Sequence, residues 1–378
     1  MSRIKSPFQK WLYRNRLEIK VAIGLMLFFI VVFLCLRLFY KPPVQPDTQT
    51  QALSLAQDKG VEFVLNHLTY RRGVIKQFDP LKNSQENEYL SETLGLWMVY
   101  LVETQRQSIF DKQVKNLQRY FLSPEDWVYW RIDQSTPSSC NASLDDLRIA
   151  FALAQAGKIW KQKKYLALSA VMAQRMKKIN LRDNYFVESY CEAPQPDISF
   201  KVDLSYLDLP AMAYLSQFDK DWQAVLYRSQ KLLNGGKTPT GFYFDKYLID
   251  KSKYGLQDMN LINQLICAQV ESQVNGKPSK LYLWLKNEYL KKGKVYGRYH
   301  PVTLKALVDY ESPAVYGLML SLAVFQNDME FAQPLAKKLL LLQNNNGSFG
   351  QAPFEAFDHI LILTALRHYQ TFVQESMH

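Results

Sequence analysis

Cysteine and histidine are scarce in this sequence, with four and five residues among 378. The cysteines form no CxxC pair, and no histidine lies at metal-ligand spacing. These absences argue against a zinc site and against a disulfide-rich scaffold. Cys140 and Cys191 both fall in loop-like sequence, which leaves two alternatives for them, one disulfide or two isolated thiols.

A concentrated basic patch is also missing, although the formal net charge is +11. Residues 1–41 carry eight Lys or Arg against Glu18 and so account for +7, and the remaining +4 is spread among interspersed acids. Nucleic acid is therefore not expected as a partner. The composition is 48% apolar, with 23 Tyr and 21 Phe, which is ample for a large buried core.

One stretch near the N-terminus is apolar enough for a membrane anchor. An uninterrupted apolar run fills residues 21–36 between Lys20 and Arg37, and the Arg37 side chain can extend to the membrane interface. Three prolines follow, as in a short stiff spacer. We predict a cytoplasmic basic tail at residues 1–20, a transmembrane anchor at 21–40, a spacer at 41–50 and one large domain at 51–378.

A cleaved signal peptide is the alternative to this anchor. It requires small residues at a cleavage site, whereas the apolar run continues into the bulky LRLFYKPPVQP. Lys and Arg dominate before the run, so the positive-inside rule puts the N-terminus in the cytoplasm. The expected location is the cell membrane, with a single span and the C-terminal domain extracellular.

Beyond the spacer, apolar residues recur with helical periodicity and few convincing β runs occur. We predict twelve helices, at residues 51–68, 87–104, 109–121, 143–161, 164–179, 203–217, 219–234, 258–274, 279–291, 312–326, 328–343 and 354–374. The fourth, eighth and tenth are apolar nearly all round, whereas the fifth, seventh, ninth and eleventh carry a polar stripe. Alternating inner and outer helices, six of each, predict an all-α fold, the (α/α)6 toroid.

Successive inner helices of such a toroid run parallel, so polar residues at their N-termini should converge on one cleft. The residues expected there are Ser91, Glu92, Asp145, Asp146, Asp203, Tyr206, Asp258 and Glu311. Helix capping selects the same residue types, and Ser143 with Asp146 matches a capping box. Capping and chemistry therefore compete as explanations for Asp146 and Asp258, while Ser91 as the cap leaves Glu92 available for chemistry.

Three loop features near these helix starts each have two interpretations. Trp130, followed by Arg131, either stacks on a sugar ring or packs against the toroid rim, and Tyr206 has the same alternatives. The stretch NNNGSFG at residues 344–350 either borders the cleft or forms a simple turn.

Several segments resemble glycoside hydrolase family 8. LSETLGLWMVY resembles the Ser-Glu pair that opens the second helix of the family's barrel. NASLDDLRIAFALAQAGKIW is similar to the Asp-x-Asp-Leu-x-Ile-Ala motif of bacterial endoglucanases that accompany cellulose synthases. DLSYLDLPAMAYL resembles the family's Pro-Ser-Tyr segment, and GLQDMNLINQL resembles the stretch with its catalytic base. ESPAVYGLMLSLA looks like a later inner helix of the same barrel, and the order and spacing of these segments extend the resemblance over roughly residues 55–375.

The resemblance implies roles for particular residues. Glu92 would protonate the leaving oxygen, Asp258 would activate water, and Asp146 would hold the sugar beside the scissile bond, with no metal or organic cofactor. The expected substrate contacts are Trp130, Tyr206, Asp145 and Arg131. Two positions depart from the family pattern: Leu144 replaces an Asp, and Leu261 stands near the place of an expected Arg.

The sequence thus predicts a membrane-anchored, inverting endo-hydrolase of an exopolysaccharide or cell-envelope glycan. The polysaccharide is its expected substrate, and a polysaccharide synthase complex is a further expected partner. The alternative is a weakly active or inactive glycan-binding protein that assists polysaccharide assembly or export, which the Leu144 and Leu261 departures motivate.

Overall fold

The computed structural model describes residues 48–70, 75–76, 88–256 and 259–376. The predicted basic tail, the predicted anchor and most of the spacer lie outside these residues. Thr50–His378 forms one compact unit. Across the described ranges, no helix combines the length and the apolar character that a bilayer span requires.

Every one of the twelve predicted segments contains an α-helix. The inner helices are α4 (Ser91–Glu103), α6 (Ser143–Ile159), α8 (Leu209–Leu215), α10 (Leu261–Asn275), α12 (Pro313–Phe325) and α14 (Ala356–Ser376). The outer helices are α3 (Thr48–Asn66), α5 (Gln107–Asn116), α7 (Lys163–Ile179), α9 (Asp221–Gly235), α11 (Lys280–Lys292) and α13 (Met329–Leu342). A π-helical turn, η2 (Leu117–Phe121), continues α5.

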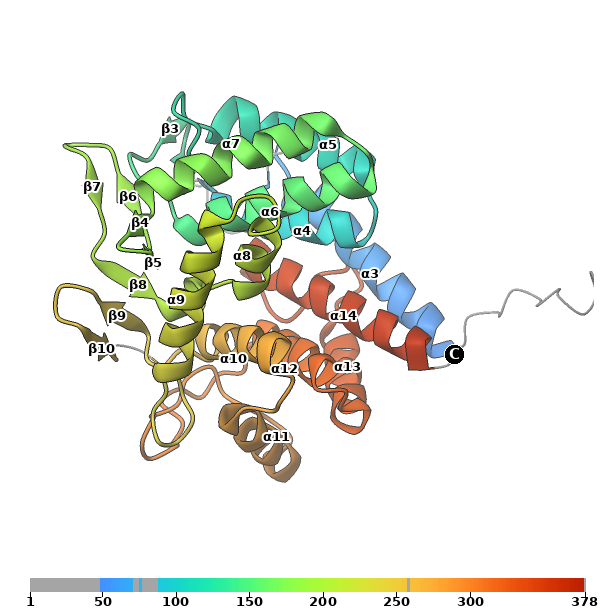
Figure 1. Cartoon of the computed structure of the whole chain (residues 1–378). Helices are drawn as coiled ribbons and strands as arrows, with labels where there is room; N and C mark the ends of the chain where they lie inside the picture. Colours follow the sequence, from blue (N-terminus) through green and yellow to red (C-terminus); the bar gives the residue numbers. More distant parts are fainter. Residues whose placement is uncertain (1–47, 71–74, 77–87, 257–258, 377–378) are drawn as a thin grey trace, which may run out of the picture. The chain divides into compact units, whose positions relative to one another are not determined.

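The inner helices form a closed ring. Each one contacts the next in chain order, from α4 through α6, α8, α10 and α12 to α14, and α14 returns to contact α4. Outer helices pack against this ring, for example α7 on α6 and α13 on α12 (Figure 1). The predicted alternation of inner and outer helices is therefore confirmed.

Burial along the helices follows the apolar pattern of the sequence. In the inner helix α12, every residue from Ala314 to Ala323 is buried. In the outer helix α7, the buried residues recur every three or four positions, as in Tyr165, Ser169, Met172 and Met176. A helix with one apolar face packs in the outer layer, and a helix that is apolar on all sides packs in the inner ring.

Short antiparallel strands, which the sequence did not predict, connect the helices. They pair as β1 (Glu88–Leu90), β2 (Arg131–Asp133) and β3 (Thr136–Pro137); β4 (Leu181–Arg182) and β5 (Tyr185–Phe186); β6 (Tyr190–Cys191) and β7 (Asp197–Ile198); and β8 (Lys201–Asp203), β9 (Lys246–Leu248) and β10 (Lys253–Gly255). Strands of two or three residues are too short to show an alternating pattern. Strand β1 leads into α4, and β8 leads through the 3-10 turn η3 (Leu204–Tyr206) toward α8. Figure 1 shows β3 to β10 gathered on one side of the helices.

Gly157 allows α6 and α7 to approach closely. A Cβ atom at this position would lie 2.6 Å from Leu166 Cγ and 3.1 Å from the Leu166 backbone nitrogen. Real atoms do not approach so closely, so a larger residue must push α7 away from α6.

We expect Gly157→Val to lower the free energy of unfolding by about 1–3 kcal/mol, because the added methyl groups overpack this interface. Ala167→Val, on the exposed face of α7, is the matched control and should cost only about 0.5 kcal/mol through helix propensity. Urea denaturation followed by circular dichroism measures both. Equal midpoints for the two variants would contradict the role given to Gly157.

Candidate active site

The N-terminal ends of α4 and α6 are joined by a side-chain hydrogen bond. Ser91 Oγ donates to Asp145 Oδ2 over 2.5 Å. Gly95 permits this approach, because a Cβ there would lie 3.3 Å from Arg148 Cβ and 3.4 Å from Ile149 Cγ1. Glu92 follows Ser91 in the first turn of α4, so it lies in the turn that Asp145 of α6 contacts through the Ser91 hydroxyl.

Glu92 is largely withdrawn from solvent, although it carries a carboxyl group. Burial raises its pKa above the usual range, Arg148 opposes this increase, and Glu355 adds to it. A carboxyl group in such surroundings holds its proton to a higher pH than an exposed one. Glu92 is thus better suited to donate a proton than an exposed glutamate is.

Asp145 shares the environment of Glu92. It is 5% exposed, and burial together with the Glu92 charge raises its pKa to about 7, while Arg148 and the Ser91 hydroxyl oppose the increase. Arg148 is itself buried, and its Nη1 atom has no hydrogen-bond partner in the described part of the chain. An unsatisfied buried donor is available to a ligand oxygen.

Tyr206, on the turn η3, is the third predicted residue in this neighbourhood. Burial raises its pKa, and the charges of Asp145, Asp203 and Glu92 add to the increase. Asp203 itself caps η3, accepting hydrogen bonds from Ser205 N at 2.9 Å and Ser205 Oγ at 2.7 Å. For Asp203 the capping explanation is therefore correct.

Two acids that the sequence reasoning missed lie at the start of α14. Burial raises the pKa of Glu355, and burial together with the Glu355 and Glu92 charges raises the pKa of Asp358 to about 7. The signal was present, because both acids fall at the start of the last predicted helix, 354–374, as Glu92 falls in the first turn of α4. We refer to Glu92, Asp145, Glu355 and Asp358 as the acidic cluster.

Asp146 faces a different group of residues. It is 1% exposed, and its Oδ2 atom accepts hydrogen bonds from Asn141 Nδ2 at 3.0 Å and Val128 N at 3.4 Å. Asn141 also bonds Asn180 and the backbone of Tyr190. Asp146 is therefore held by the loops around it, and the structure favours Asp145 over Asp146 as the residue beside Glu92.

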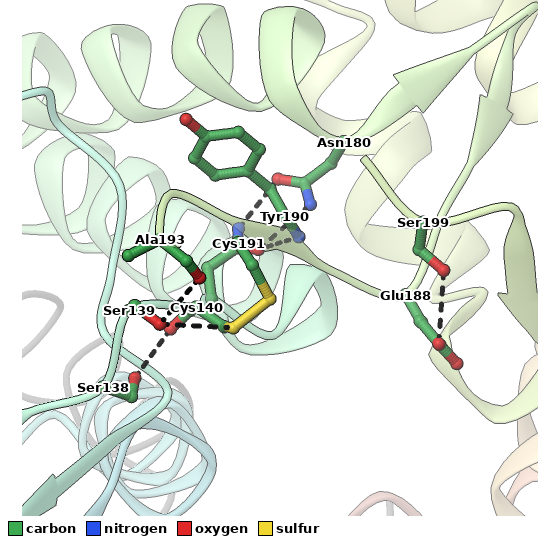
Figure 2. Close-up of a disulfide and its surroundings, with 10 residues drawn as sticks. Ser138, Ser139, Cys140, Asn180, Glu188, Tyr190, Cys191, Ala193 and Ser199 are labelled. Atoms are coloured by element: carbon green, nitrogen blue, oxygen red, sulfur yellow. Dashed lines mark hydrogen bonds between the residues drawn. A yellow bond between two sulfur atoms is a disulfide. The ribbon is translucent and has the colours of Figure 1, made fainter. Parts of the chain in front are cut away.

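A disulfide between Cys140 and Cys191 secures the same loops (Figure 2). The sequence left this pairing open. The bond joins two segments 51 positions apart, one before α6 and one at β6. Trp130 N donates to Cys140 O over 3.1 Å, so the disulfide also fixes the segment that carries Trp130, immediately before β2.

Trp130 and Arg131 lie beside the start of α4. The Trp130 side chain is 37% exposed, and its backbone oxygen accepts from Ser91 N at 3.0 Å. Arg131 forms ion pairs at 2.8 Å with both Glu88 and Asp133. Trp130 thus presents an open aromatic surface next to the acidic cluster, whereas the Arg131 guanidinium is engaged by acids of its own sheet.

Several predicted helix caps are wrong. Helix α4 follows Leu90 and α6 follows Ala142, so Ser91 and Ser143 are the first helical residues and make no capping bond. The Ser91 hydroxyl is instead committed to Asp145, which is the contact that joins the two helices.

The remaining predicted positions divide into three kinds. Asp258 lies outside the described residues. Leu144 and Leu261, the departures from the family pattern, are buried and contribute to packing. Residues 344–350 form a tight turn whose Gly347 packs against the Lys59 backbone, so the turn explanation is correct.

Among the residues that the structure covers, no three His, Cys, Asp or Glu side chains are grouped so as to hold a metal ion.

Comparisons with known proteins agree with this architecture. Residues 71–270 match the family described as Glycosyl hydrolases family 8. The chain is 30% identical over 313 residues to the putative lipoprotein YdaJ of Bacillus subtilis (strain 168), covering 82% of this chain and 84% of that protein. A novel alpha-amylase from Clostridium perfringens superposes with a TM-score of 0.76 at 24% identity, over 83% of this chain and 98% of that one. Endoglucanase Cel10, a family 8 glycosyl hydrolase from Klebsiella pneumoniae, gives 0.61 at 15% identity, over 85% and 99%. The two solved structures therefore share the fold.

The raised pKa of Asp145 makes stability depend on pH. With a pKa of about 7 in the folded protein and roughly 3.9 in the unfolded chain, the folded state binds more protons between these values. The free energy of unfolding should therefore fall as pH rises from about 4 to about 7. Asp145→Asn should remove part of this fall, at most about 4 kcal/mol.

Thermal unfolding of the wild type and Asp145→Asn at pH 5 and pH 8 measures this effect. We expect the variant to lose less stability than the wild type at the higher pH. Asp183→Asn, at an exposed aspartate, should follow the wild type. Parallel pH curves for all three proteins would show that Asp145 ionises normally.

Proposed function

Because the chain belongs to the family Glycosyl hydrolases family 8, and so is a glycoside hydrolase, we propose that it cleaves a polysaccharide outside the cell by an inverting endo mechanism. Glu92 is the proposed acid and Asp258 the proposed base. The observation that carries this proposal is the partly buried carboxyl group of Glu92, whose pKa is raised at the point where two inner helices meet.

Glu92 acts at the glycosidic oxygen in this mechanism. Its proton passes to the leaving oxygen as the bond to the anomeric carbon breaks. This transfer requires a protonated carboxyl group, and the raised pKa of Glu92 favours that form. The aglycone then departs as a neutral alcohol.

Asp258 activates water on the opposite face of the sugar. It takes a proton from the water as the water oxygen attacks the anomeric carbon, which inverts the configuration. An inverting pair needs carboxyl groups roughly 6.5–9.5 Å apart to leave room for that water. In the sequence, Asp258 comes three positions before Leu261, the first residue of α10, and α10 is a ring neighbour of α8 and α12. This order supports the assignment of Asp258 to the same end of the ring as Glu92.

The neighbours of Glu92 are the proposed sugar contacts. Asp145 and Tyr206 share its electrostatic environment, and Arg148 offers a free donor. Trp130 offers an aromatic face on which a pyranose ring can stack. Asp146 and Arg131 are proposed to act indirectly, Asp146 by holding the loop at Asn141 and Arg131 by bracing β1 and β2.

An extracytoplasmic location is part of the proposal. Disulfides persist in oxidising compartments, and the Cys140–Cys191 bond is consistent with one. The lipoprotein name of the Bacillus relative favours attachment to a membrane. The apolar run at residues 21–36 supplies the proposed anchor, with the N-terminus in the cytoplasm. The proposed substrate is then an exopolysaccharide that emerges from its synthase at the outer face of the membrane.

Replacing either proposed catalytic carboxyl group tests the mechanism. Glu92→Gln and Asp258→Asn should each lower kcat by about 10²–10⁴, because each removes one proton transfer. Reducing ends released from starch, mixed-linkage β-glucan, xylan and exopolysaccharide are the measurement. Glu125→Gln and Asp250→Asn, at exposed acids, are matched controls and should cut like the wild type. If Glu92→Gln and Asp258→Asn also cut like the wild type, the acid and base are assigned wrongly. If nothing cuts but polymer is retained, a binding protein is the better description.

A charge placed in the apolar run tests the anchor. The double variant Phe28→Arg/Phe29→Arg should move the protein out of the membrane fraction, because each arginine costs about 2.5–3.5 kcal/mol at the centre of a spanning helix. Tyr13→Arg, before the run, is the control and should remain membrane-bound after carbonate washing. Retention of the double variant in the washed membranes would rule out residues 21–40 as the anchor.

A further inference from the structure

An open pocket lies at the C-terminal ends of α4 and α12, beside the last turns of α14. Its volume is about 410 Å³, within the roughly 300–1,000 Å³ typical of small-molecule sites. Glu103, Phe325, Asn327, Arg367, His368 and Thr371 are among the residues that line it. We call it the C-terminal pocket.

This pocket is separate from the acidic cluster, although both use the same helices. Glu92 lies in the first turn of α4, and Glu103 is its last residue. Eleven residues of α-helix at 1.5 Å each place the two backbone positions roughly 17 Å apart. A ligand in the C-terminal pocket therefore has a different set of partners from a sugar at Glu92.

The polar groups of the pocket are incompletely paired. Glu103 Oε2 is buried without a hydrogen-bond partner among the described residues, and the nearest His368 nitrogen is 3.6 Å away, too far for a hydrogen bond. His368 Nδ1 lies 3.1 Å from Ser321 Oγ, which fixes the ring. The His368 ring is thus held between Ser321 and Glu103, and it contributes to the lining of the pocket.

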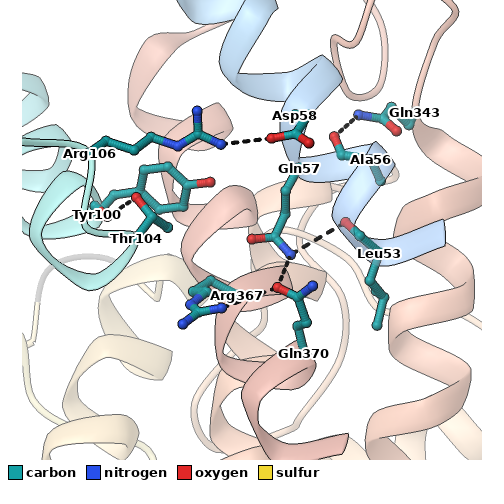
Figure 3. A network of polar contacts seen from close by, with 10 residues as sticks. All are labelled: Leu53, Ala56, Gln57, Asp58, Tyr100, Thr104, Arg106, Gln343, Arg367 and Gln370. Atoms are coloured by element: carbon teal, nitrogen blue, oxygen red, sulfur yellow. Dashed lines mark hydrogen bonds and ion pairs between the residues drawn. The ribbon is translucent and has the colours of Figure 1, made fainter. Parts of the chain in front are cut away.

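A second unpaired group lies next to the pocket. The Tyr100 side chain is completely buried, and within the described ranges its hydroxyl has no hydrogen-bond partner. Burial raises its pKa, and Arg106, Asp58, Arg367 and Glu103 all act on it. Figure 3 shows the Tyr100 ring between the Arg106–Asp58 ion pair and the Gln57–Gln370–Arg367 contacts. The Tyr100 hydroxyl is closed off from solvent and is not part of the pocket lining, so it belongs to the surroundings of the pocket.

The remaining lining fits a sugar. Phe325 and Phe372 are half-buried, and the Phe325 ring contacts the His368 ring at 5.2 Å. Aromatic faces bind the C–H side of a pyranose, and planar polar side chains bind its hydroxyls. A hydroxyl both donates and accepts, which matches this mixed set.

The charge balance of the pocket excludes a strongly anionic ligand. Glu103 and Glu375 face Arg367 and His368 across the same lining. A phosphate or a polyanion would meet repulsion from both glutamates. A neutral polyhydroxyl molecule meets no such repulsion.

We propose that the C-terminal pocket is a non-catalytic binding site for a neutral sugar unit of a glycan. The inference rests on the proposed function in that this sugar belongs to the polysaccharide that the enzyme cleaves. A second point of attachment, one helix length from Glu92, keeps a long polymer associated between cuts. Short oligosaccharides that reach one site at a time gain nothing from it.

Calorimetry on the full-length chain tests the proposal, in a detergent without a sugar headgroup. The protein carries Glu92→Gln so that the ligand survives, and maltohexaose, cellohexaose and xylohexaose are the probes. We expect at least one probe to bind at two sites. Arg367→Met should weaken one of them at least tenfold, and Thr371→Trp, which fills the pocket, should abolish it. Trp130→Ala should weaken the other site.

Two controls make the result decisive. Arg228→Met, at an exposed arginine of α9, should change neither site, and thermal unfolding confirms that each variant is folded. With Glu92 restored, Arg367→Met should leave hydrolysis of the short probes unchanged and raise KM for the polymer about threefold to tenfold. Binding that both pocket variants leave intact overturns the proposal. Pocket-dependent binding without any hydrolysis overturns the proposed function but not this site.

Discussion

The close packing of α4 against α6 at their N-terminal ends is the contact on which the rest of the site depends. Gly95 has no side chain, so the α6 backbone near Arg148 lies against α4. The Ser91 hydroxyl then reaches Asp145, and Glu92 is drawn into the buried environment that raises its pKa. If α4 and α6 were separated by one more atomic diameter, water would reach these carboxyl groups. Their pKa values would then stay in the ordinary range.

The burial that raises the pKa values of these carboxyl groups also lowers the stability of the folded protein when the groups ionise. Glu92, Asp145, Glu355 and Asp358 all have raised pKa values in a region where Arg148 is the cation that opposes the increase for Glu92 and Asp145. Several acids in one apolar surrounding lower the stability of the folded protein when they ionise. The acidic cluster is therefore tolerated because the ring of buried helices around it supplies a large apolar core.

The helices were predictable from sequence, and the contacts at their ends were not. Apolar periodicity located all twelve segments because burial acts on every turn of a helix, and α12 and α7 show its two forms. The two- and three-residue strands carry no such repeated signal. The acid at Glu92 was found through its motif, whereas Glu355 and Asp358 were missed because no motif accompanies them. The choice between Asp145 and Asp146 required coordinates, because adjacent helical residues point in directions about 100° apart. The Cys140–Cys191 pairing also depends on how distant loops fold together.

Closure of the ring by α14 has a consequence for biogenesis. The last helix of the chain packs against α4, α12 and, through Gln370 and His359, the outer helix α3. The hydrogen bonds between α3 and α14 join residues about 300 positions apart. They cannot form while the C-terminal segment is still being synthesised or exported. Glu355 and Asp358 arrive with that same helix. A nascent chain therefore lacks two of the four residues of the acidic cluster until α14 has been synthesised and has packed onto the ring.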